Sequence, residues 1–508
     1  MSILGTNLGG CYEGIALAHL LFRAMKSLVT CPFGRCLVQL AYVKVRANVY
    51  LFRSILFMPL VSDTSESNIQ NKNLSQKRSI ITPLLRLPRN VYILLIFTTG
   101  KGFQLSISTL TLNYYVHSLG YQPEFIGIFS AMPAIGALIS AVPVGFLADR
   151  IGRKPVLVIT AIFTPIFLAA CALVTSPFLL LSCAFMQGVV STAYWVTNLP
   201  LLTESTTESQ RVGVFALNSF LLLGVGALGN LLGGAIPEFM AGILHVSPAS
   251  TIALRYGVFA AALFTFVFGL PLWFLHEPKR TAANKTKSVV LEESVRNSGP
   301  LAEAVLHEKR ERLPIGLFVK LLIPDLLFTM GEGAVVALMQ LFFILRFNLL
   351  PGPLGIIFTI SGLAGGLFSL TAPLFVKRWS KLRVITTVQY LTAPLMILIG
   401  FAPTLPLAIA GEYTRSFMRI LIEPIYAAFA MEQVSDRHRA TLSGFYAVTW
   451  SIGFSIGPSI GGWLQSNVGL SASFVFGAFC LILAPSLLLT FFGRLLKQPR
   501  AVESQRGK

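Results

Sequence analysis

Twelve long apolar segments constrain this chain more than any other feature of its sequence. A helix needs about 20 mostly apolar residues to cross the roughly 30 Å hydrocarbon core of a bilayer, and twelve stretches of the 508 residues meet that requirement. We number them as runs one to twelve, at residues 91–116, 123–147, 155–175, 178–203, 211–235, 251–275, 316–345, 354–376, 383–401, 405–431, 439–464 and 472–493. The sequence therefore predicts an all-α membrane protein.

The composition agrees with this class of protein. Charged residues make up 12% of the chain and hydrophobic residues 54%, whereas soluble domains have about 25% charged residues. The excess of 40 Lys and Arg over 21 Asp and Glu then indicates cytoplasmic loops rather than nucleic-acid binding. The six cysteines form neither a disulfide framework nor a metal-ligand pattern, so the sequence predicts no metal site.

The connections between the runs alternate in charge. Those that follow the even-numbered runs are basic, as is the tail, while those that follow the odd-numbered runs hold only one basic residue, Arg346. By the positive-inside rule both termini face the cytoplasm, and we expect a multi-pass protein of the cell membrane, either a bacterial inner membrane or a plasma membrane. The expected parts are an N-terminal extension (1–89), a first six-helix bundle (90–275), a cytoplasmic linker (276–313), a second bundle (314–495) and a cytoplasmic tail (496–508).

The N-terminal extension does not resemble the rest of the chain. Before Asp63 it contains six basic residues and a single acidic one, Glu13, and it has no long uncharged run. One interpretation is a basic, acidic-poor targeting segment. The other, which we favour, is that translation starts at Met58, so that residues 1–57 are a mis-annotated start rather than part of the mature protein.

A constant offset of 228 residues aligns the two halves of the chain. It places Pro123 on Pro351, Gly127 on Gly355, and Arg211 on Arg439. Self-similarity of this kind is the sequence signature of a structural repeat. We therefore expect two six-helix bundles related by an internal repeat, with the alignment broken near run six by a longer connection at 236–250.

A basic motif with spaced glycines follows run two. A cytoplasmic loop that obeys topology accounts for its Arg and Lys residues, but not for its glycines or its one Asp. The motif consists of Gly145, Asp149, Arg150, Gly152, Arg153 and Lys154. In a chain of twelve runs it resembles the signature loop of the major facilitator superfamily, and the resemblance extends over residues 90–495.

This resemblance implies a gate at the cytoplasmic side. Gly145 lets two helices approach closely, and Asp149 caps the positive N-terminal end of run eleven in the other bundle. The second half has Lys377 at the position of Asp149, and a lysine cannot cap a helix N-terminus. The gate is therefore expected in one half only.

Runs five and eleven carry glycines at spacings that favour tight helix packing and a kink. They are Gly229, Gly233 and Gly234 in run five, and Gly453, Gly457, Pro458, Gly461 and Gly462 in run eleven. In the superfamily, this pattern with a proline in helix five is similar to that of proton-coupled drug antiporters. Here Asn230 replaces the proline of run five and the fuller pattern lies in run eleven, which leaves the antiporter type favoured but open.

Run ten carries four charged residues on one face, Glu412, Arg415, Arg419 and Glu423. Their spacing confines them to an arc of about 80° on a helix. Because each charge facing lipid at mid-membrane costs about 2.5 to 3.5 kcal/mol, we expect this face to lie in the protein interior. One interpretation is a self-neutralising ladder of i,i+3 and i,i+4 pairs. The other is that the two neighbouring arginines bind an anion.

Two further charges lie near mid-membrane, Lys101 in run one and Glu332 in run seven, with Gln104 at the repeat position of Glu332. Neither charge has an opposite charge three or four residues away. Runs one and seven are related by the repeat, so we predict that Lys101 and Glu332 pair in one conformation and separate in another, as a proton-coupling switch would. A static structural pair is the alternative interpretation.

The resemblance implies a secondary active transporter that works by alternating access around a site near the midplane. We expect proton-coupled efflux of small amphipathic organic compounds, driven by the proton gradient without a cofactor. The alternative is proton-coupled uptake of an organic anion or other nutrient through Arg415, Arg419 and Lys101. A non-transporting sensor or a membrane-embedded enzyme is the hypothesis from another class, but the runs that would line the cavity hold no nucleophile and base pair, so no catalytic residue is expected. The expected partners are a small-molecule substrate, protons and the lipid bilayer, with a monomeric chain and no nucleic acid.

Overall fold

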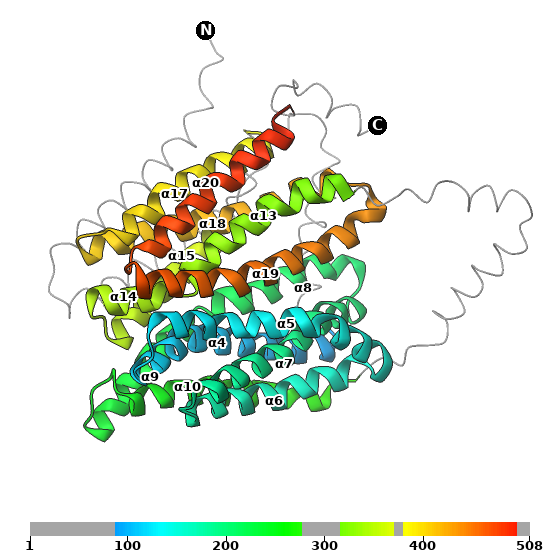
Figure 1. Cartoon of the computed structure of the whole chain (residues 1–508). Helices are drawn as coiled ribbons and strands as arrows, with labels where there is room; N and C mark the ends of the chain where they lie inside the picture. Colours follow the sequence, from blue (N-terminus) through cyan, green and yellow to red (C-terminus); the bar gives the residue numbers. More distant parts are fainter. Residues whose placement is uncertain (1–86, 277–314, 370–378, 495–508) are drawn as a thin grey trace, which may run out of the picture. The chain divides into compact units, whose positions relative to one another are not determined.

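The computed structural model describes residues 87–276, 315–369 and 379–494, which are helical and contain no strand (Figure 1). In chain order the helices are α4 (Arg89–Ser118), α5 (Pro123–Ile151), α6 (Arg153–Leu173), α7 (Pro177–Glu204), α8 (Glu208–Ser219), η2 (Phe220–Val225), α9 (Leu228–Leu244), α10 (Thr251–Gly269), η3 (Leu270–Phe274), α13 (Ile315–Val336), α14 (Met339–Phe347), α15 (Pro351–Ser369), α17 (Lys381–Gly400), α18 (Leu405–Glu432), α19 (Asp436–Asn467) and α20 (Ala472–Phe492). Each of the twelve predicted runs is one helix or a set of consecutive helical pieces, so the predicted all-α fold is confirmed. Nearly all of the predicted extension, linker and tail lies outside the described residues, as does Lys377.

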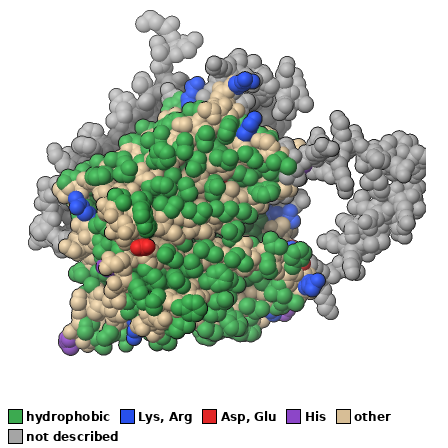
Figure 2. Space-filling view, in the orientation of Figure 1, with side chains coloured by type: hydrophobic (Ala, Val, Ile, Leu, Met, Phe, Trp, Pro, Cys, Tyr) green, Lys and Arg blue, Asp and Glu red, His purple; other side chains and the backbone are tan. Residues whose placement is uncertain are grey.

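The helices have the length and polarity of membrane spans. Within the described ranges, nine helices are long and apolar enough to cross a membrane, and one face of the molecule is covered mostly by hydrophobic side chains (Figure 2). A water-soluble protein does not expose an apolar surface of this extent. The prediction of a multi-pass membrane protein is therefore confirmed.

Run five differs from its prediction in two ways. It continues to Leu244 rather than ending at 235, because Pro237 lies inside α9 instead of ending the helix, and the connection to run six shrinks to 245–250. It is also interrupted by the π-helical segment η2. Next to η2, Gly226 lies so close to α4 that a Cβ added to it would be 2.8 Å from the Cα of Gly102. Glycines at both positions allow the two backbones to touch.

The repeat produces two equivalent contacts between the bundles. A Cβ added to Gly462 of α19 would lie 2.4 Å from the Pro123 carbonyl oxygen in α5. A Cβ added to Gly234 of α9 would lie 2.4 Å from the Pro351 carbonyl oxygen in α15. The offset of 228 residues relates each member of the first pair to a member of the second, so the two-bundle repeat seen in the sequence is present in the contacts.

The other glycines of runs five and eleven pack within their own bundle. Added Cβ atoms on Gly457 and Gly461 would lie 2.4 and 2.2 Å from carbonyl oxygens of α13. Gly453 packs against Thr329 of α13, and Gly229 and Gly233 pack against α4. Pro458 lies inside α19, and its carbonyl oxygen would be 2.3 Å from a Cβ added to Gly127. These contacts leave no room for a side chain.

We expect Gly462→Val to impair transport by preventing α5 and α19 from closing on each other. Overpacking a tight contact costs about 1–3 kcal/mol, and here the atoms to be displaced belong to the backbone at Pro123 and Gly127. The measurement is the reaction of a cysteine placed beside the contact with a membrane-impermeant thiol reagent, which should become faster in the variant. Gly242→Val is the matched control, since no described atom lies within 4 Å of a Cβ on Gly242. Equal reaction rates in both variants would contradict the expectation.

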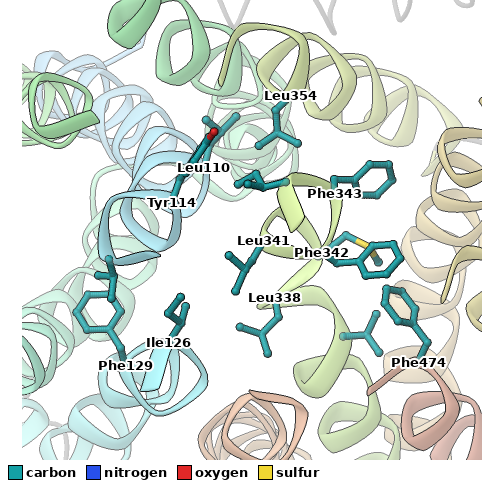
Figure 3. Close-up of a cluster of buried hydrophobic side chains, with 14 of the residues drawn as sticks. Leu110, Tyr114, Ile126, Phe129, Leu338, Leu341, Phe342, Phe343, Leu354 and Phe474 are labelled. Atoms are coloured by element: carbon teal, nitrogen blue, oxygen red, sulfur yellow. The ribbon is translucent and has the colours of Figure 1, made fainter. Parts of the chain in front are cut away.

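A cluster of buried hydrophobic side chains joins the two bundles at one end (Figure 3). We call the end of the helices at which the described chain stops at 276 and resumes at 315 the linker end, and the opposite end the distal end. The cluster lies in the distal halves of its helices and includes Leu110, Tyr114, Ile126 and Phe129 of the first bundle and Leu338, Leu341, Phe342, Phe343, Leu354 and Phe474 of the second. It excludes water from the distal end of the interface.

Hydrogen bonds between the bundles reinforce this closure. Run seven is broken between α13 and α14, and the carbonyl oxygen of Ala337 in the break accepts a bond of 2.8 Å from Nδ2 of Asn113 in α4. The amide of Gly352 donates to Glu238 Oε1 at 3.1 Å, and the amide of Glu124 donates to Ser466 Oγ at 2.9 Å. The distal end is therefore closed by both apolar and polar contacts.

The linker end is more open. No described atom lies within 4 Å of a Cβ added to Gly145 in α5 or to Gly444 in α19, and the neighbouring Phe146 is 67% exposed. The structure differs here from the close helix approach expected at Gly145. The physical reason is that α5 and α19 approach each other near their distal ends, at Gly127 and Gly462, about five helical turns away.

Candidate functional site

A buried arginine organises the charges of run ten. Arg415 of α18 donates from Nε to Glu412 Oε2 at 2.8 Å and from Nη2 to Glu412 Oε1 at 2.9 Å, which is a bidentate pair. Its third nitrogen, Nη1, donates to Oε2 of Glu332 in α13 at 2.9 Å. All three residues are at most 3% exposed. Each nitrogen of Arg415 is therefore bonded to a carboxylate, so the charge of this guanidinium is paired by protein groups.

The second arginine of run ten has a different environment. Nε of Arg419 lies 3.8 Å from the same Glu332 oxygen, which is an ion pair without a hydrogen bond. Its side chain is 33% exposed, whereas that of Arg415 is 3% exposed. Among the described residues, no hydrogen-bond partner is present for its terminal nitrogens. Arg419 is thus held weakly and is accessible.

Glu332 has one unused oxygen. Its Oε2 receives both arginines, while its Oε1 is buried and has no hydrogen-bond partner in the described part of the chain. A buried acceptor without a donor costs about 1–3 kcal/mol, more when it is charged. A donor from outside the described residues, such as a water or a ligand, would satisfy this oxygen.

The four charges of run ten do not form the expected ladder. Glu412 and Arg415 pair at i,i+3 as that interpretation requires. Arg419 turns to Glu332 of the neighbouring helix, and Glu423 is exposed and forms no ion pair with Arg419 in the described structure. The expectation that the whole face lies in the interior is met at Glu412 and Arg415 only. Glu423 lies two to three turns nearer the linker end, where the bundles are more open.

Lys101 is held by neutral groups of the first bundle. Its ammonium donates to Gln104 Oε1 and to Ser191 Oγ of α7, each at 2.8 Å, and it is 2% exposed. The predicted pairing of Lys101 with Glu332 is absent from this conformation, because Glu332 is bonded to Arg415. Whether that pair forms in another conformation stays a prediction.

The repeat relates these two groups of residues. Gln104 and Ser191 of the first bundle occupy the positions of Glu332 and Arg419 of the second. In each bundle, a side chain on the first helix accepts a hydrogen bond from a cation. Gln104 accepts from Lys101, and Glu332 accepts from Arg415. The sequence placed Gln104 opposite Glu332, but it did not single out Ser191, whose only signal was its alignment with Arg419.

The gate motif ties the linker ends of helices together within one bundle. Gly152 ends α5 with φ 97°, a conformation that favours glycine. Arg153 Nη1 lies 2.5 Å from Oε1 of Glu204 at the end of α7, and Lys154 donates to the carbonyl oxygen of Trp273 at 3.1 Å. Arg150 is exposed. The capping role expected for Asp149 stays a prediction.

The same ion pair recurs in the second bundle. Lys381 pairs with Glu432, and the offset of 228 residues places Arg153 on Lys381 and Glu204 on Glu432. The two acidic residues were missed in the sequence because they lie at the ends of runs four and ten, outside the motif. The repeat could have found them, since both halves carry an acid at this position.

A second membrane-embedded carboxylate lies on α13. Thr449 of α19 donates to Asp325 Oδ2 at 2.6 Å. Asp325 is seven residues before Glu332 and therefore about two turns nearer the linker end on a similar face. Asp325 thus lies at the contact between α13 and α19.

The sequence of this chain matches the model of a known protein family. A family model described as Major Facilitator Superfamily matches residues 92–455 and 321–508. The chain belongs to the Major Facilitator Superfamily. Members of this superfamily are membrane transporters of small molecules, so the predicted class of this protein, a multi-pass transporter, is confirmed at that level.

Curated relatives match only part of this superfamily member. Solute carrier family 22 member 2 of Rattus norvegicus is 31% identical over 166 residues, which is 32% of this chain and 27% of the relative. Multidrug resistance protein MdtG of Salmonella arizonae is 27% identical over 175 residues, which is 33% of this chain and 42% of the relative. The matched segments thus span less than half the length of these relatives.

Solved structures agree on the fold. The crystal structure of a D-xylose-proton symporter has a TM-score of 0.62 at 15% identity and covers 79% of this chain and 98% of that one. The crystal structure of nucleoside transporter NupG has a TM-score of 0.58 at 17% identity and covers 79% of this chain and 99% of that one. At such identities the likeness shows the fold alone.

Proposed function

We propose that this superfamily member is a proton-coupled secondary transporter of small amphipathic organic compounds, and that Glu332 binds the coupled proton. The observation that carries the proposal is the environment of the Glu332 carboxylate. It is 1% exposed, and Oε1 has no hydrogen-bond partner among the described residues. A proton on Oε1 removes the buried negative charge and converts this oxygen from an acceptor without a donor into an O–H donor.

Proton binding at Glu332 changes the charge balance between two helices. While it is ionised, Glu332 of α13 attracts Arg415 and Arg419 of α18. Protonation removes that attraction and leaves two guanidinium groups with only Glu412 as counter-ion. Because α13 packs on α19, whose Gly462 touches the other bundle, a rearrangement at Glu332 reaches the contact between the bundles through two helices.

The geometry supports alternating access. The distal end is closed by the cluster of Figure 3 and by bonds such as that from Asn113 to Ala337, while Gly145 and Gly444 have open space at the linker end. With the linker end in the cytoplasm, as the basic connections predict, this conformation is closed on the side away from the cytoplasm. Rocking of one bundle against the other would open the distal side instead.

Two modes of coupling use the same proton site. Export by antiport, the favoured expectation from the sequence, is supported by the name of the relative MdtG, a multidrug resistance protein. Uptake of an organic anion with a proton is supported by the unfilled donors of Arg419 and by Lys101, which has neutral partners only. In either mode we place the protein in the cell membrane as a monomer with cytoplasmic termini, with the proton gradient in place of a cofactor.

Proton flux in proteoliposomes tests this function. The full chain is reconstituted with a pH dye inside the vesicles and a proton gradient is imposed. Organic anions and lipophilic cations are then added in turn. A compound that triggers proton movement supports coupled transport, and the direction of movement identifies the mode. Proton movement that is the same in protein-free vesicles for every compound would contradict the proposal.

We expect a disulfide between cysteines at positions 124 and 466 to arrest transport reversibly. The amide of Glu124 lies 2.9 Å from Ser466 Oγ across the closed distal end, so Glu124→Cys and Ser466→Cys bring two thiols together in this conformation only. Mild oxidation should abolish transport by the double variant, and reduction should restore it. Each single variant is the control, and failure of the double variant to cross-link would show that the distal-closed state is not populated.

A further inference from the structure

We propose that Arg419 binds an anionic group of the substrate, and that the substrate is an amphipathic organic anion that moves in the same direction as the proton. This inference rests on the proposed function, since it takes Glu332 as the proton site. It goes further by naming the charge of the substrate and the residue that binds it. The steps that lead to it concern the free donors of Arg419, the net charge of the site and the sign of the coupling.

The two arginines of α18 differ in their partners and in their exposure. Arg415 directs all three of its nitrogens at Glu412 and Glu332 within 2.9 Å and is 2% exposed, so its charge is already paired and its side chain is out of reach of solvent. Arg419 approaches Glu332 no closer than 3.8 Å. An arginine has five N–H donors in a planar fork that matches a carboxylate, and the described residues supply no acceptor to the terminal nitrogens of Arg419. The side chain of Arg419 is 33% exposed to solvent, whereas that of Arg415 is 3% exposed.

The site has an excess of positive charge. The charges near mid-membrane are three cations, the buried Lys101 and Arg415 and the partly exposed Arg419, and two buried carboxylates, Glu332 and Glu412. Lys101 uses two of its three N–H donors on the neutral oxygens of Gln104 and Ser191. A buried charge is stable when it is paired. One negative group from a ligand cancels this excess while Glu332 is ionised and keeps it from rising to two when Glu332 is protonated, whereas a cationic ligand increases the excess.

Among the described residues around Glu332, no other charged group supplies the negative charge that would offset the excess. α19 and α20 pack on α13, and beyond the first turn of α19 neither helix has a charged residue. Their only ionisable side chains there are the phenol of Tyr446 and the thiol of Cys480, and neither carries a positive charge in any protonation state. On α13 itself, Asp325 lies two turns away and is bonded to Thr449. The charge seen by Glu332 is therefore set by Arg415, Arg419, Glu412 and the ligand.

An anion on Arg419 and a proton on Glu332 favour each other. Both the anion and ionised Glu332 are negative groups drawn to the same guanidinium, so binding of the anion disfavours the ionised form of Glu332. The anion adds one negative charge and the proton, taken from water onto Oε1, adds one positive charge, which leaves the total charge of the site unchanged. By linkage the proton favours anion binding to the same extent. A cation would instead compete with the proton, which is the opposite sign of coupling.

The remainder of the substrate would meet an apolar wall. Trp195 of α7 is 54% exposed and lies one turn from Ser191, which contacts Lys101. On α18 the rings of Tyr413 and Phe417 lie on a different face from the charges, where the Tyr413 hydroxyl donates to a carbonyl oxygen of α15, so they are not part of this wall. An aromatic body with one acidic group fits the combination of Trp195 and the cations better than a bare inorganic ion.

Two matched aromatic probes of opposite charge test the inference. Toluene-4-sulfonate and 4-tolyltrimethylammonium share a ring and keep their charges at every working pH, so neither carries protons through lipid. With the full chain in proteoliposomes, we expect the sulfonate to move together with protons in the same direction and the ammonium to move none. In Arg419→Gln we expect a loss of about tenfold or more in sulfonate-driven proton flux, since a charged hydrogen-bond donor is removed. Arg419→Lys should recover part of it, because the charge remains without the planar fork.

The controls separate this inference from the proposed function. Arg346→Gln removes an exposed arginine at the distal end and should leave the flux unchanged. Proton flux that is driven by the ammonium in the opposite direction, and is lost in Glu332→Gln, would overturn the inference and leave the proton site standing. Sulfonate-driven flux that survives in Arg419→Gln would overturn the assignment of Arg419. Absence of flux with both probes would count against the inference and the proposed function together.

Discussion

Arg415→Gln is expected to lower the stability of the folded protein more than any other single substitution in the site. The guanidinium makes three hydrogen bonds to two carboxylates, Glu412 and Glu332, and all three residues are buried. Its removal leaves two negative charges in a low-dielectric interior. Breaking a buried ion pair by removing one partner costs about 3–5 kcal/mol, which is a large part of the stability of a typical protein.

Thermal unfolding of the purified protein in detergent measures this effect. We expect a large decrease in the unfolding temperature of Arg415→Gln and a smaller decrease in the double variant Arg415→Gln/Glu412→Gln, because the second change removes one of the two stranded charges. Arg346→Gln, which removes an exposed arginine, is the control for loss of a positive charge. A single variant as stable as the wild type would show that Arg415 does not hold the two acids together.

Glu332→Gln is expected to uncouple transport from the proton gradient while leaving exchange intact. Glutamine has nearly the shape of protonated glutamate and can still bond to its neighbours, but it cannot gain or lose a proton. For one coupled proton, a gradient of one pH unit supports about tenfold accumulation of substrate, since one pH unit corresponds to 1.36 kcal/mol. In the variant this accumulation should fall to none, while counterflow of labelled substrate continues.

The dependence of transport on pH gives a second measurement of the same substitution. Wild-type accumulation should depend on the pH gradient imposed across the membrane, and that dependence should vanish in Glu332→Gln. Glu423→Gln is the comparison, because the structure leaves Glu423 exposed and unpaired with Arg419, and we expect it to retain most of the coupling. Accumulation that persists in Glu332→Gln would assign the proton to a different carboxylate, with Asp325 as the next to test.

Local patterns determined most of the fold. The twelve apolar runs gave the helices because a membrane span is a property of a single segment. The repeat gave the equivalent contacts at Gly462 and Gly234 because both halves use the same packing. The end of run five was missed because a proline, here Pro237, often ends a helix. The π-helical segment η2 was missed because its sequence of five apolar residues and one glycine gives no local signal.

The candidate site was predictable only in part. The spacing of Glu412 and Arg415 places them on one face of a helix, and they do pair. The partner of Glu332 in this conformation was not predicted: Glu332 binds Arg415, and its pairing with Lys101 in another conformation stays a prediction. That choice depends on the rotation of α13 and α18 about their axes, which is set by packing among helices distant in sequence. No spacing rule within a single helix contains this information.

The break in run seven has a consequence for the solvent. The Ala337 carbonyl is freed from the helix ladder and obtains its hydrogen bond from Asn113 of the opposite bundle. When the bundles part at the distal end this bond is lost, and water must replace it, because a buried carbonyl without a donor is costly. Distal opening is therefore also a wetting step. Osmolytes too large to enter the gap would therefore favour the closed form. We expect osmotic pressure to slow transport without any solute binding to the protein.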